Sequence, residues 1–369
     1  MNRLSRLRVS GFKSIRALDL ELGALNVLIG PNGAGKSNLL SFLRMLGALA
    51  DGRLSRFVAK EGGANMLLHH GLKRTPEIAL EVSFDAGQRD LTYRVTLVGA
   101  PPDTFFLDGE EIYSTNAGGS GTVLLPGTKK AVALSILTQS PRAEDQELVR
   151  LIQGLTHYHF HDTSAEAPIR QGSAIDDNRS LRDNGANLAA FLYMLRQTSL
   201  RHYESIRDTI RLATPFFDDF VLEPSKLDPK TIQLEWRERS SEMPFFAHHL
   251  SDGTLRFIAL ATALLQPDPP EILSLDEPEL GLHPYAITLL ASLVRSVSRT
   301  RQVIIATQSV TLLDVLAEPD EVIVVERKGS ERDGSESLFR RLDPEALRGW
   351  LEEYTLGELW EKNVLGGRP

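Results

Sequence analysis

Three glycines and a Lys-Ser pair separate two apolar segments near the start of the sequence. The segment LNVLIGPNGAGKSNLLSFL, residues 25–43, is typical of a strand, a glycine-rich turn and a helix that begins at about Lys36. Glycine has no Cβ, so Gly30, Gly33 and Gly35 allow the backbone to turn sharply with its N–H groups directed inward. Such a nest of amides binds an anion, and the positive end of the helix dipole strengthens the same site.

Residues 30–37 fit the pattern G-x-x-x-x-G-K-[S/T], the Walker A phosphate-binding loop, in the strand–loop–helix context that it requires. Lys36 can reach the β- and γ-phosphates of a nucleotide, and the Ser37 hydroxyl is suited to bind Mg²⁺. We therefore predict that the chain binds ATP and Mg²⁺. The expected nucleotide contacts form one run: Gly30, Pro31, Asn32, Gly33, Ala34, Gly35, Lys36, Ser37 and Asn38.

A second set of reactive side chains follows the apolar segment at residues 271–275. Asp276 and Glu277 stand at the end of this expected strand, and ligands in open α/β sheets bind beyond the carboxyl ends of the strands. We expect Asp276 to hold Mg²⁺, usually through water, and Glu277 to orient or deprotonate an attacking water. Gln308 ends a later expected strand, and its neutral amide can hydrogen-bond water or a γ-phosphate.

Ser251, Asp252 and Gly253 precede an apolar helical run at residues 254–265. A serine cap and a glycine at a helix N-terminus form a second anion-binding end. An ordinary helix cap explains such a triplet in most proteins. Its position shortly before the strand that ends at Asp276 favours a role for Ser251 and Gly253 at a nucleotide phosphate.

The elements that must position these residues fall into three groups. Alternating apolar and polar residues at 77–85, 91–99 and 104–113 predict an antiparallel sheet. Helices are expected at 143–155 and 186–217, strands at 157–163 and 231–238, a loop at 116–122 and a hairpin turn at 330–337. Strands at 271–278, 301–308 and 320–327 alternate with helices at 285–298 and 309–317, which is typical of a parallel sheet.

We therefore expect an α/β P-loop NTPase with a mostly parallel core sheet, an antiparallel β lobe and a helical insertion. Residues 1–75 would form the N-terminal part of the ATPase core. Residues 76–245 would form the antiparallel lobe and the helical insertion, and residues 246–369 the C-terminal part of the core.

Composition narrows the class of protein. The chain has 369 residues, of which 42% are hydrophobic, and it has no cysteine, which excludes disulfides and thiolate metal sites. No segment reaches the roughly 18 apolar residues of a membrane span, so we expect a cytoplasmic protein. The net charge of −8 disfavours a protein that coats nucleic acid, although it does not exclude a local basic patch.

Cations cluster near the N-terminus, where a solvated strand edge explains them equally well: Arg3, Arg6, Arg8, Lys13 and Arg16.

Residues 7–41 and 248–316 resemble the head domain of ABC-type ATPases of the RecF/SMC/OLD kind. LSDGTLR resembles the ABC signature, LSLDEPE the Walker B motif, LGLHP the D-loop and ATQS the switch strand, while VSGFKSI resembles the N-terminal strand of this DNA-associated branch. YHFHDTS, NGANLAAFLYML and TLGELWEKNVLGG resemble stand-alone ATPases of the AAA_21 type, which carry no Toprim nuclease domain.

The resemblance implies a head-to-tail homodimer in which ATP on one Walker A motif is covered by Ser251 and Gly253 of the other subunit. Some residues depart from the family pattern. Asp252 and Thr254 replace a glycine and a glutamine of the usual signature, no Q-loop glutamine is evident, and Gln308 replaces a frequent histidine. Slow turnover is therefore expected.

The residues thus predict an Mg²⁺-dependent ATPase, and the resemblance implies that its ATP-bound dimer acts as a switch in DNA repair, DNA maintenance or phage defence. The alternative is a regulatory module that hydrolyses ATP slowly and holds or releases a separately encoded nuclease. DNA and that nuclease are the candidate partners, and no membrane is expected.

Three histidines close together in the sequence are one further candidate site. His157, His159 and His161 alternate on one face of an expected strand, with Asp162 beside them. A metal site is one interpretation. A polar strand edge, or one histidine near the nucleotide, is the interpretation that we favour.

Overall fold

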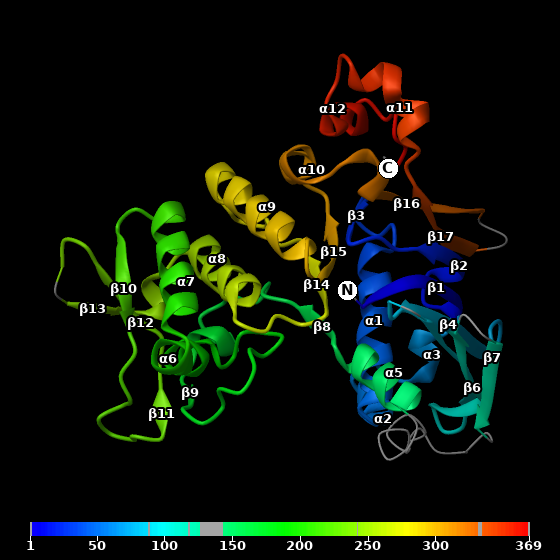
Figure 1. Ribbon diagram of the computed structural model, residues 1–369, viewed down its shortest axis with the longest axis horizontal. Coiled ribbons are helices and arrows are strands. Elements are labelled where there is room, and N and C mark those ends of the chain that lie inside the picture. The colour runs from blue at the N-terminus through cyan, green and yellow to red at the C-terminus, as the bar shows by residue number, and fades with distance from the viewer. Residues whose placement is uncertain are drawn as a thin grey trace.

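The computed structural model describes residues 2–87, 89–116, 119–125, 143–241, 243–330 and 334–367. Two β-sheets occupy one end of the molecule, and a mostly helical lobe extends to the other end (Figure 1). Helix α1 (Lys36–Ala50) packs between the two sheets, since its apolar residues share one core with both. Within the described residues no helix is long and apolar enough to cross a membrane.

The central sheet contains the strand that leads into the phosphate loop. Its strand order is β17-β16-β3-β15-β14-β8. The strands are β3 (Leu25–Ile29), β8 (Leu155–Tyr158), β14 (Ile272–Asp276), β15 (Gln302–Thr307), β16 (Val322–Ser330) and β17 (Gly334–Arg341). All pairings are parallel except that of β16 with β17. The carboxyl ends of β3, β14 and β15 therefore meet at one edge, as the sequence predicted.

Both faces of the central sheet are buried. On β15, Val303 and Ile305 belong to the core cluster that contains residues of α8 (Asp252–Leu265) and α9 (Pro284–Ser298). Ile304 and Ala306 face the other way, into the cluster that contains α1 and the second sheet. A strand buried on both faces needs apolar residues without alternation, which explains the continuous apolar runs in this part of the sequence.

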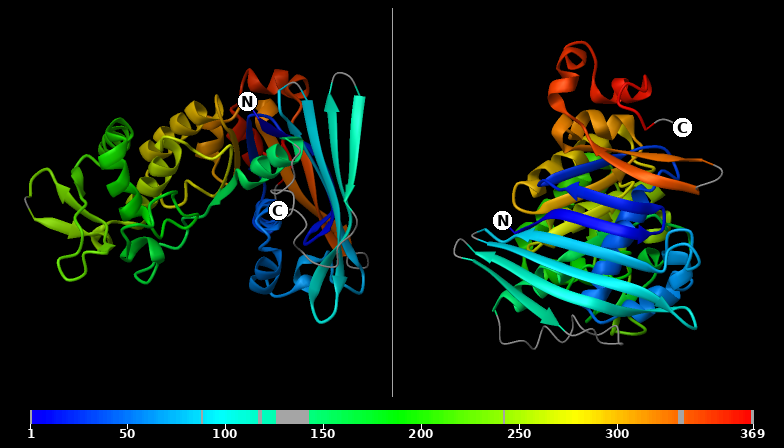
Figure 2. Two further views of the ribbon diagram at one scale, coloured as in Figure 1. Left: turned by 60° about the horizontal axis from the view of Figure 1, so that its bottom comes forward. Right: turned by 90° about the vertical axis from the view of Figure 1, so that its right-hand side faces the viewer.

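The second sheet is antiparallel, with the order β2-β1-β4-β5-β6-β7, and its broad face is visible in Figure 2. The strands are β1 (Arg3–Phe12), β2 (Ile15–Glu21), β4 (Glu77–Asp85), β5 (Arg89–Ala100), β6 (Thr104–Asn116) and β7 (Gly119–Leu125). The expected loop at 116–122 is shorter than predicted, because residues 119–122 already pair with β6. Residues 117 and 118 lie outside the described residues.

The lobe at the far end combines short strands with helices. Its members are α6 (Leu188–Thr198), α7 (Leu200–Ala213), β9 (Ser173–Ala174), β10 (Phe217–Val221), β11 (Thr231–Ile232), β12 (Glu235–Glu238) and β13 (Pro244–Phe246). The strand expected at 231–238 is in fact two strands in different sheets, since β11 pairs with β9 and β12 pairs with β10 and β13. The strand expected at 157–163 ends at Tyr158, where its pairing with β14 stops.

Shorter helices complete the fold. They are α2 (Leu54–Lys60), α3 (Ala64–Leu67), α5 (Ala143–Gln153), α10 (Val310–Leu316), α11 (Pro344–Leu351) and α12 (Leu356–Glu361), with 3₁₀ turns at Pro168–Arg170, Ala247–His249 and Pro319–Glu321. The hairpin predicted around 330–337 is formed by β16 and β17, and residues 331–333 lie outside the described residues. Because β1 and β2 share a sheet with β4, and β8 joins the central sheet, sheets cross the expected boundary at 75/76. The division into three parts stays a proposal.

Candidate ATP site

The phosphate loop, residues 30–37, connects β3 to α1. A Cβ added to Gly30 would lie 2.2 Å from the backbone oxygen of Val325 on β16, and one added to Gly35 would lie 2.1 Å from Ser337 Oγ on β17. Both glycines also have positive φ values, 154° and 117°. Close approach and backbone conformation therefore both require glycine at these two positions.

Lys36 lies inside the loop. Its side chain is almost fully buried, and Nζ donates to the backbone oxygens of Gly30 at 2.6 Å and Pro31 at 3.2 Å. Burial lowers the pKa of Lys36, whereas the nearby charges of Glu277 and Asp276 favour its charged form. The ammonium group thus stands between the loop and the carboxylates that follow β14.

Two serines that the sequence analysis did not single out support the loop. The Asn38 side-chain amide donates to Ser14 Oγ at 2.6 Å, and Ser337 Oγ lies 2.7 Å from the same oxygen. Ser337 also donates to the backbone oxygen of Ala34. Ser14 follows β1 and Ser337 lies on β17, so the loop is braced from both sheets. Ser14 falls within the segment VSGFKSI, but neither serine has a spacing that marks it.

The carboxylates predicted for hydrolysis meet Gln308 beside the loop. Glu277 adopts a positive φ of 38°, a strained conformation for a residue other than glycine, and its N–H donates to the backbone oxygen of Ala306 at 2.7 Å. Gln308 Nε2 donates to Glu277 Oε1 at 2.7 Å. Strain of this kind persists where surrounding structure imposes it, often at functional sites. The structure thus brings together the two residues predicted to be catalytic.

The residues predicted to hold Mg²⁺ fit a hard cation. Asp276 Oδ1 is buried without a hydrogen-bond partner among the described residues, which leaves an anionic oxygen free to accept a cation or its water. A serine hydroxyl and a carboxylate are the oxygen donors that Mg²⁺ prefers, and substrate phosphates usually supply the remaining ligands. In the described part of the chain no group of three or more His, Asp or Glu residues could itself hold a metal ion.

Glu279 is a further buried acid that the sequence analysis missed. Burial raises its pKa, while the Thr307 hydroxyl donates to one of its oxygens. Its other oxygen, Oε2, is buried without a partner among the described residues. Glu279 therefore connects the segment that follows β14 to the end of β15.

Of the three histidines, only His157 lies on the outer strand β8, whereas His159 and His161 follow its end, so the prediction that all three lie on one strand is wrong. His161 Nε2 donates to the backbone oxygen of Asp276 at 2.7 Å, and the rings of His159 and His161 lie 4.3 Å apart. His157 contacts Ser274, and burial lowers its pKa to about 3, so this ring is neutral. His161 therefore lies beside Asp276, and a role for one of these histidines near the nucleotide stays a prediction.

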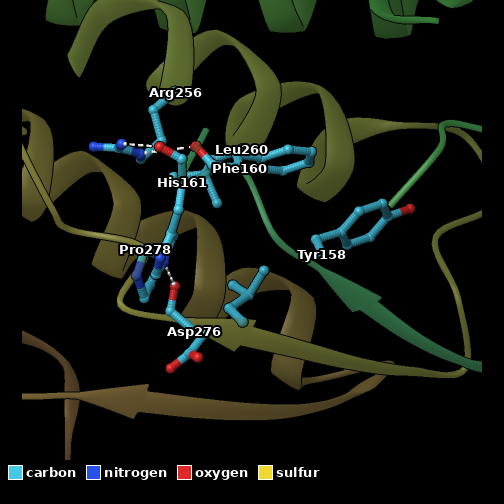
Figure 3. Close-up of a pocket in the computed structure, with 8 residues that line it drawn as sticks. Tyr158, Phe160, His161, Arg256, Leu260, Asp276 and Pro278 are labelled. Atoms are coloured by element: carbon cyan, nitrogen blue, oxygen red, sulfur yellow. Dashed lines mark hydrogen bonds between the residues drawn. The ribbon is translucent and has the colours of Figure 1, made fainter. Parts of the chain in front are cut away.

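An arginine links the helix that follows Ser251 to the same edge. Arg256 Nε donates to the backbone oxygen of Phe160 at 3.0 Å, and Nη2 donates to that of His161 at 3.1 Å (Figure 3). Nη1 donates to the backbone oxygen of Leu280. Helix α8 is therefore tied to the ends of β8 and β14.

Ser251 caps α8, and its hydroxyl accepts a hydrogen bond from Thr254 N at 3.1 Å. Gly253 packs against the backbone of Gly281, since an added Cβ would lie 2.1 Å from its oxygen. Within the described residues no hydrogen bond joins Ser251 or Gly253 to the phosphate loop of the same chain. The structure thus brings the Walker A residues close to the two residues predicted to be catalytic, Glu277 and Gln308, and leaves the predicted signature residues apart.

Four of the five N-terminal cations are paired with acids, whereas Arg16 on β2 is exposed and has no ion pair among the described residues. Lys13 pairs with Glu61 at 2.7 Å, and arginines of β1 pair with acids of β2 and β4. These pairs are Arg3–Asp85, Arg6–Asp19, Arg8–Asp19 and Arg8–Glu81. Strand β1 also lies between β2 and β4, so the expected solvated strand edge is an inner strand with one charged face.

Residues 25–314 match the family model AAA_21, described as "AAA domain, putative AbiEii toxin, Type IV TA system". The chain belongs to this family. The match contains the phosphate loop, the signature helix, both carboxylates and Gln308. It confirms the predicted membership in the AAA_21 type of P-loop ATPase.

This AAA_21 chain is also similar to curated proteins of two kinds. It is 24% identical to an OLD nuclease of Thermus scotoductus over 96% of this chain and 67% of that protein. It is 38% identical to the DNA replication and repair protein RecF of Parasynechococcus marenigrum, over 22% of this chain and 23% of RecF. The chain thus spans about a quarter of that RecF and about two thirds of the OLD nuclease.

Solved structures confirm the fold. An SMC head bound to the C-winged helix domain of ScpA matches with a TM-score of 0.56 and 16% identity, over 94% of this chain and 99% of that one. A Pyrococcus furiosus SMC head with an extended coiled coil matches with a TM-score of 0.58 and 14% identity, over 96% and 99% of the two chains. At such low identity the likeness establishes the ABC-type fold alone.

Proposed function

We propose that this chain is an Mg²⁺-dependent ATPase that binds ATP on residues 30–38 and hydrolyses it with Glu277 and Gln308. The observation that carries the proposal is the hydrogen bond between Gln308 and Glu277 beside a complete Walker A loop. Glu277 accepts the proton of the attacking water, and the Gln308 amide orients both the carboxylate and that water. Ser37 and Asp276 would hold Mg²⁺, which would supply positive charge to the phosphates.

Two copies form the active species. Ser251 and Gly253 make no hydrogen bond to the phosphate loop of their own chain within the described residues, and both stand at the N-terminus of α8, an element of 14 residues. A helix N-terminus with a serine hydroxyl suits a γ-phosphate. We place that phosphate on the partner subunit, so that two ATP molecules lie at one two-fold interface.

We place this ATP-driven dimer in DNA repair, DNA maintenance or defence against phages. The similarity to OLD nuclease and RecF supports this setting. The paired charges of β1 make a basic DNA-binding face on that strand less favourable, so any DNA contact would involve another surface.

A second candidate function is a slow ATPase that holds or releases a separately encoded nuclease. The neutral Gln308 at the switch position favours it, because an amide cannot change its charge during turnover. Affinity purification of the protein from its native host distinguishes these two candidate functions. Recovery of a nuclease that dissociates or activates with ATP supports the second candidate, and recovery of DNA with no nuclease supports the first.

Replacement of the proposed base tests the chemistry. Glu277→Gln keeps the phosphate contacts and removes the proton acceptor, so we expect normal ATP binding, turnover reduced by about 100-fold or more, and accumulation of the dimer. Light scattering with Mg-ATP measures the dimer, and phosphate release measures turnover. A variant that turns over at the wild-type rate would show that another group is the base.

A further inference from the structure

The last described part of the chain, residues 356–367, lies against the phosphate loop. A cavity of about 550 Å³ separates the loop from α12. It is lined by Gly30, Pro31, Asn32, Gln308, Val310, Trp360, Glu361 and Gly367. A Cβ added to Gly367 would lie only 3.7 Å from Gly30 Cα. Figure 1 shows α12 beside α10. Segments from the two ends of the sequence thus meet at the first glycine of the loop.

Glu326 on β16 is the side chain that holds this segment in place. Its Oε1 accepts a hydrogen bond from Gly367 N at 2.7 Å. Gly366 and Gly367 both have positive φ values, 81° and 73°, so the turn that brings Gly367 N to the carboxylate favours glycine at both positions. A hydrogen bond to an ionised acceptor is stronger than one between neutral groups.

Two further hydrogen bonds fix the ends of the segment. Arg340 Nη2 donates to the backbone oxygen of Leu365 at 2.7 Å, and Gly357 N donates to Asp314 Oδ1 at 2.6 Å. The segment is therefore attached to β16, β17 and α10. The same stretch of β16 packs against the loop itself, because the Val325 backbone oxygen occupies the space where Gly30 lacks a Cβ.

The cavity lies at the end of the ATP site where the γ-phosphate is expected. Gly30, Pro31 and Asn32 begin the loop, and Gln308 is the residue that we place at the γ-phosphate and the attacking water. Trp360 contributes an aromatic ring to the opposite wall, and Trp360 Nε1 would lie 3.7 Å from a Cβ added to Gly367. A displacement of Gly367 would therefore reach both the loop and Trp360.

We infer that residues 356–367 form a wall of the ATP site and that Glu326 is the positioning residue that keeps this wall against the phosphate loop. The inference rests on the proposed function, because it needs ATP on residues 30–38.

The test uses the full chain and Trp360 fluorescence. ATP binding should change the tryptophan emission of the wild type. We call the part of this change that is absent in Trp360→Phe the Trp360 signal. We expect Glu326→Ala to lose most of this signal and to bind ATP about tenfold more weakly by calorimetry, which corresponds to the loss of one charged hydrogen bond. Glu326→Gln keeps an oxygen acceptor for Gly367 N, so it should restore the signal. Glu345→Ala on α11 removes an exposed carboxylate as the matched control.

A second variant, Gly367→Ala, tests the same inference if Glu326→Ala does not fold. Gly367→Ala leaves Glu326 intact but strains a position with φ 73° and brings a Cβ within 2.8 Å of Val324 Cγ1. It should reduce ATP affinity and the Trp360 signal in the same direction. If Lys36→Ala abolishes ATP binding while Glu326→Ala and Gly367→Ala bind ATP with wild-type affinity and signal, the inference is overturned. If Lys36→Ala binds ATP normally, the proposed function itself fails.

Discussion

At the scale of the residue, Lys36 carries the largest share of the expected nucleotide affinity. Its ammonium is held by two carbonyl groups of its own loop, so a phosphate that binds there exchanges weak neutral acceptors for charged ones. The same ammonium faces Asp276 and Glu277, which would repel the nucleotide if the lysine were absent.

Lys36→Ala should therefore abolish ATP binding, or weaken it by about 100-fold or more, because the charge that meets the β- and γ-phosphates is removed. Isothermal calorimetry with Mg-ATP measures the affinity. Lys230→Ala, in an exposed segment of the far lobe, is the control and should bind as the wild type does. Unchanged affinity of Lys36→Ala would mean that residues 30–38 are not the ATP site.

The residues of the loop could be predicted from sequence because their chemistry depends on neighbours along the chain. Gly30, Gly35 and Lys36 act within one turn, so spacing alone identifies them. Ser14 and Ser337 reach the loop from two different sheets, and only the packing of those sheets brings them together. The contact between Glu277 and Gln308 likewise depends on the parallel register that sets Asp276 opposite Ala306.

At the scale of the element, the strands of the central sheet were predictable because burial on both faces gives long apolar runs. The predictions of strands were wrong where the pairing between strands, rather than the residue composition, determines the secondary structure. Residues 231–238 alternate as one strand would, yet the chain changes partner between β11 and β12. Residues 119–122 are rich in glycine, yet β6 supplies the hydrogen bonds that make them a strand. A single sequence does not contain the identity of the neighbouring strand.

The charged face of the antiparallel sheet gives a prediction with a defined pH window. Hydrogen bonds from Arg6, and then from Arg8, lower the pKa of Asp19 to about 2, from about 3.8. Because the folded pKa is depressed, the stabilisation is complete above about pH 4 and is lost as the pH falls toward 2. Asp19→Asn should cost at most about 1 kcal/mol at neutral pH, since Asp19 is half exposed.

Urea unfolding of the wild type and of Asp19→Asn, from pH 7 down to pH 2.5, measures this difference. Their free energies of unfolding should converge as the pH falls. Asp108→Asn, at an exposed position of β6, is the control and should show a small difference at every pH. A gap between wild type and Asp19→Asn that stays constant down to pH 2.5 would mean that the Arg6–Asp19 pair contributes nothing.

At the scale of the whole molecule, the predicted signature residues lie apart from the phosphate loop. The loop lies at the edge of the central sheet beside Glu277 and Gln308, and Ser251 caps α8 with no hydrogen bond to that loop among the described residues. The resemblance of the sequence motifs to heads of the RecF/SMC/OLD kind implies that a second subunit brings the two sets together, which stays a proposal. The packing of residues 356–367 on the loop was not predictable, because no local pattern joins Gly367 to Gly30.

Complementation between two inactive variants tests the shared site. Lys36→Ala disables the phosphate loop and Ser251→Arg disables the signature, so each homodimer should be inactive. A mixed dimer combines both defects in one site and leaves the other site whole. With random mixing, about half of the dimers are mixed, so roughly a quarter of the wild-type ATPase activity should return if the sites act independently.

The outcome depends on which chain Ser251 serves. If Ser251 contacts ATP on its own chain, the site of one protomer is disabled by Lys36→Ala and the site of the other by Ser251→Arg. Neither site of a mixed dimer is then intact, and no activity returns. Cooperativity between sites could hide a recovery, so the independence of the sites is measured first with mixtures of wild type and Lys36→Ala. Capture of one tagged variant by the other confirms that mixed dimers form. Suppose that the two sites hydrolyse ATP independently and that mixed dimers form but stay inactive. This result would refute the arrangement in which each subunit completes the other's ATP site.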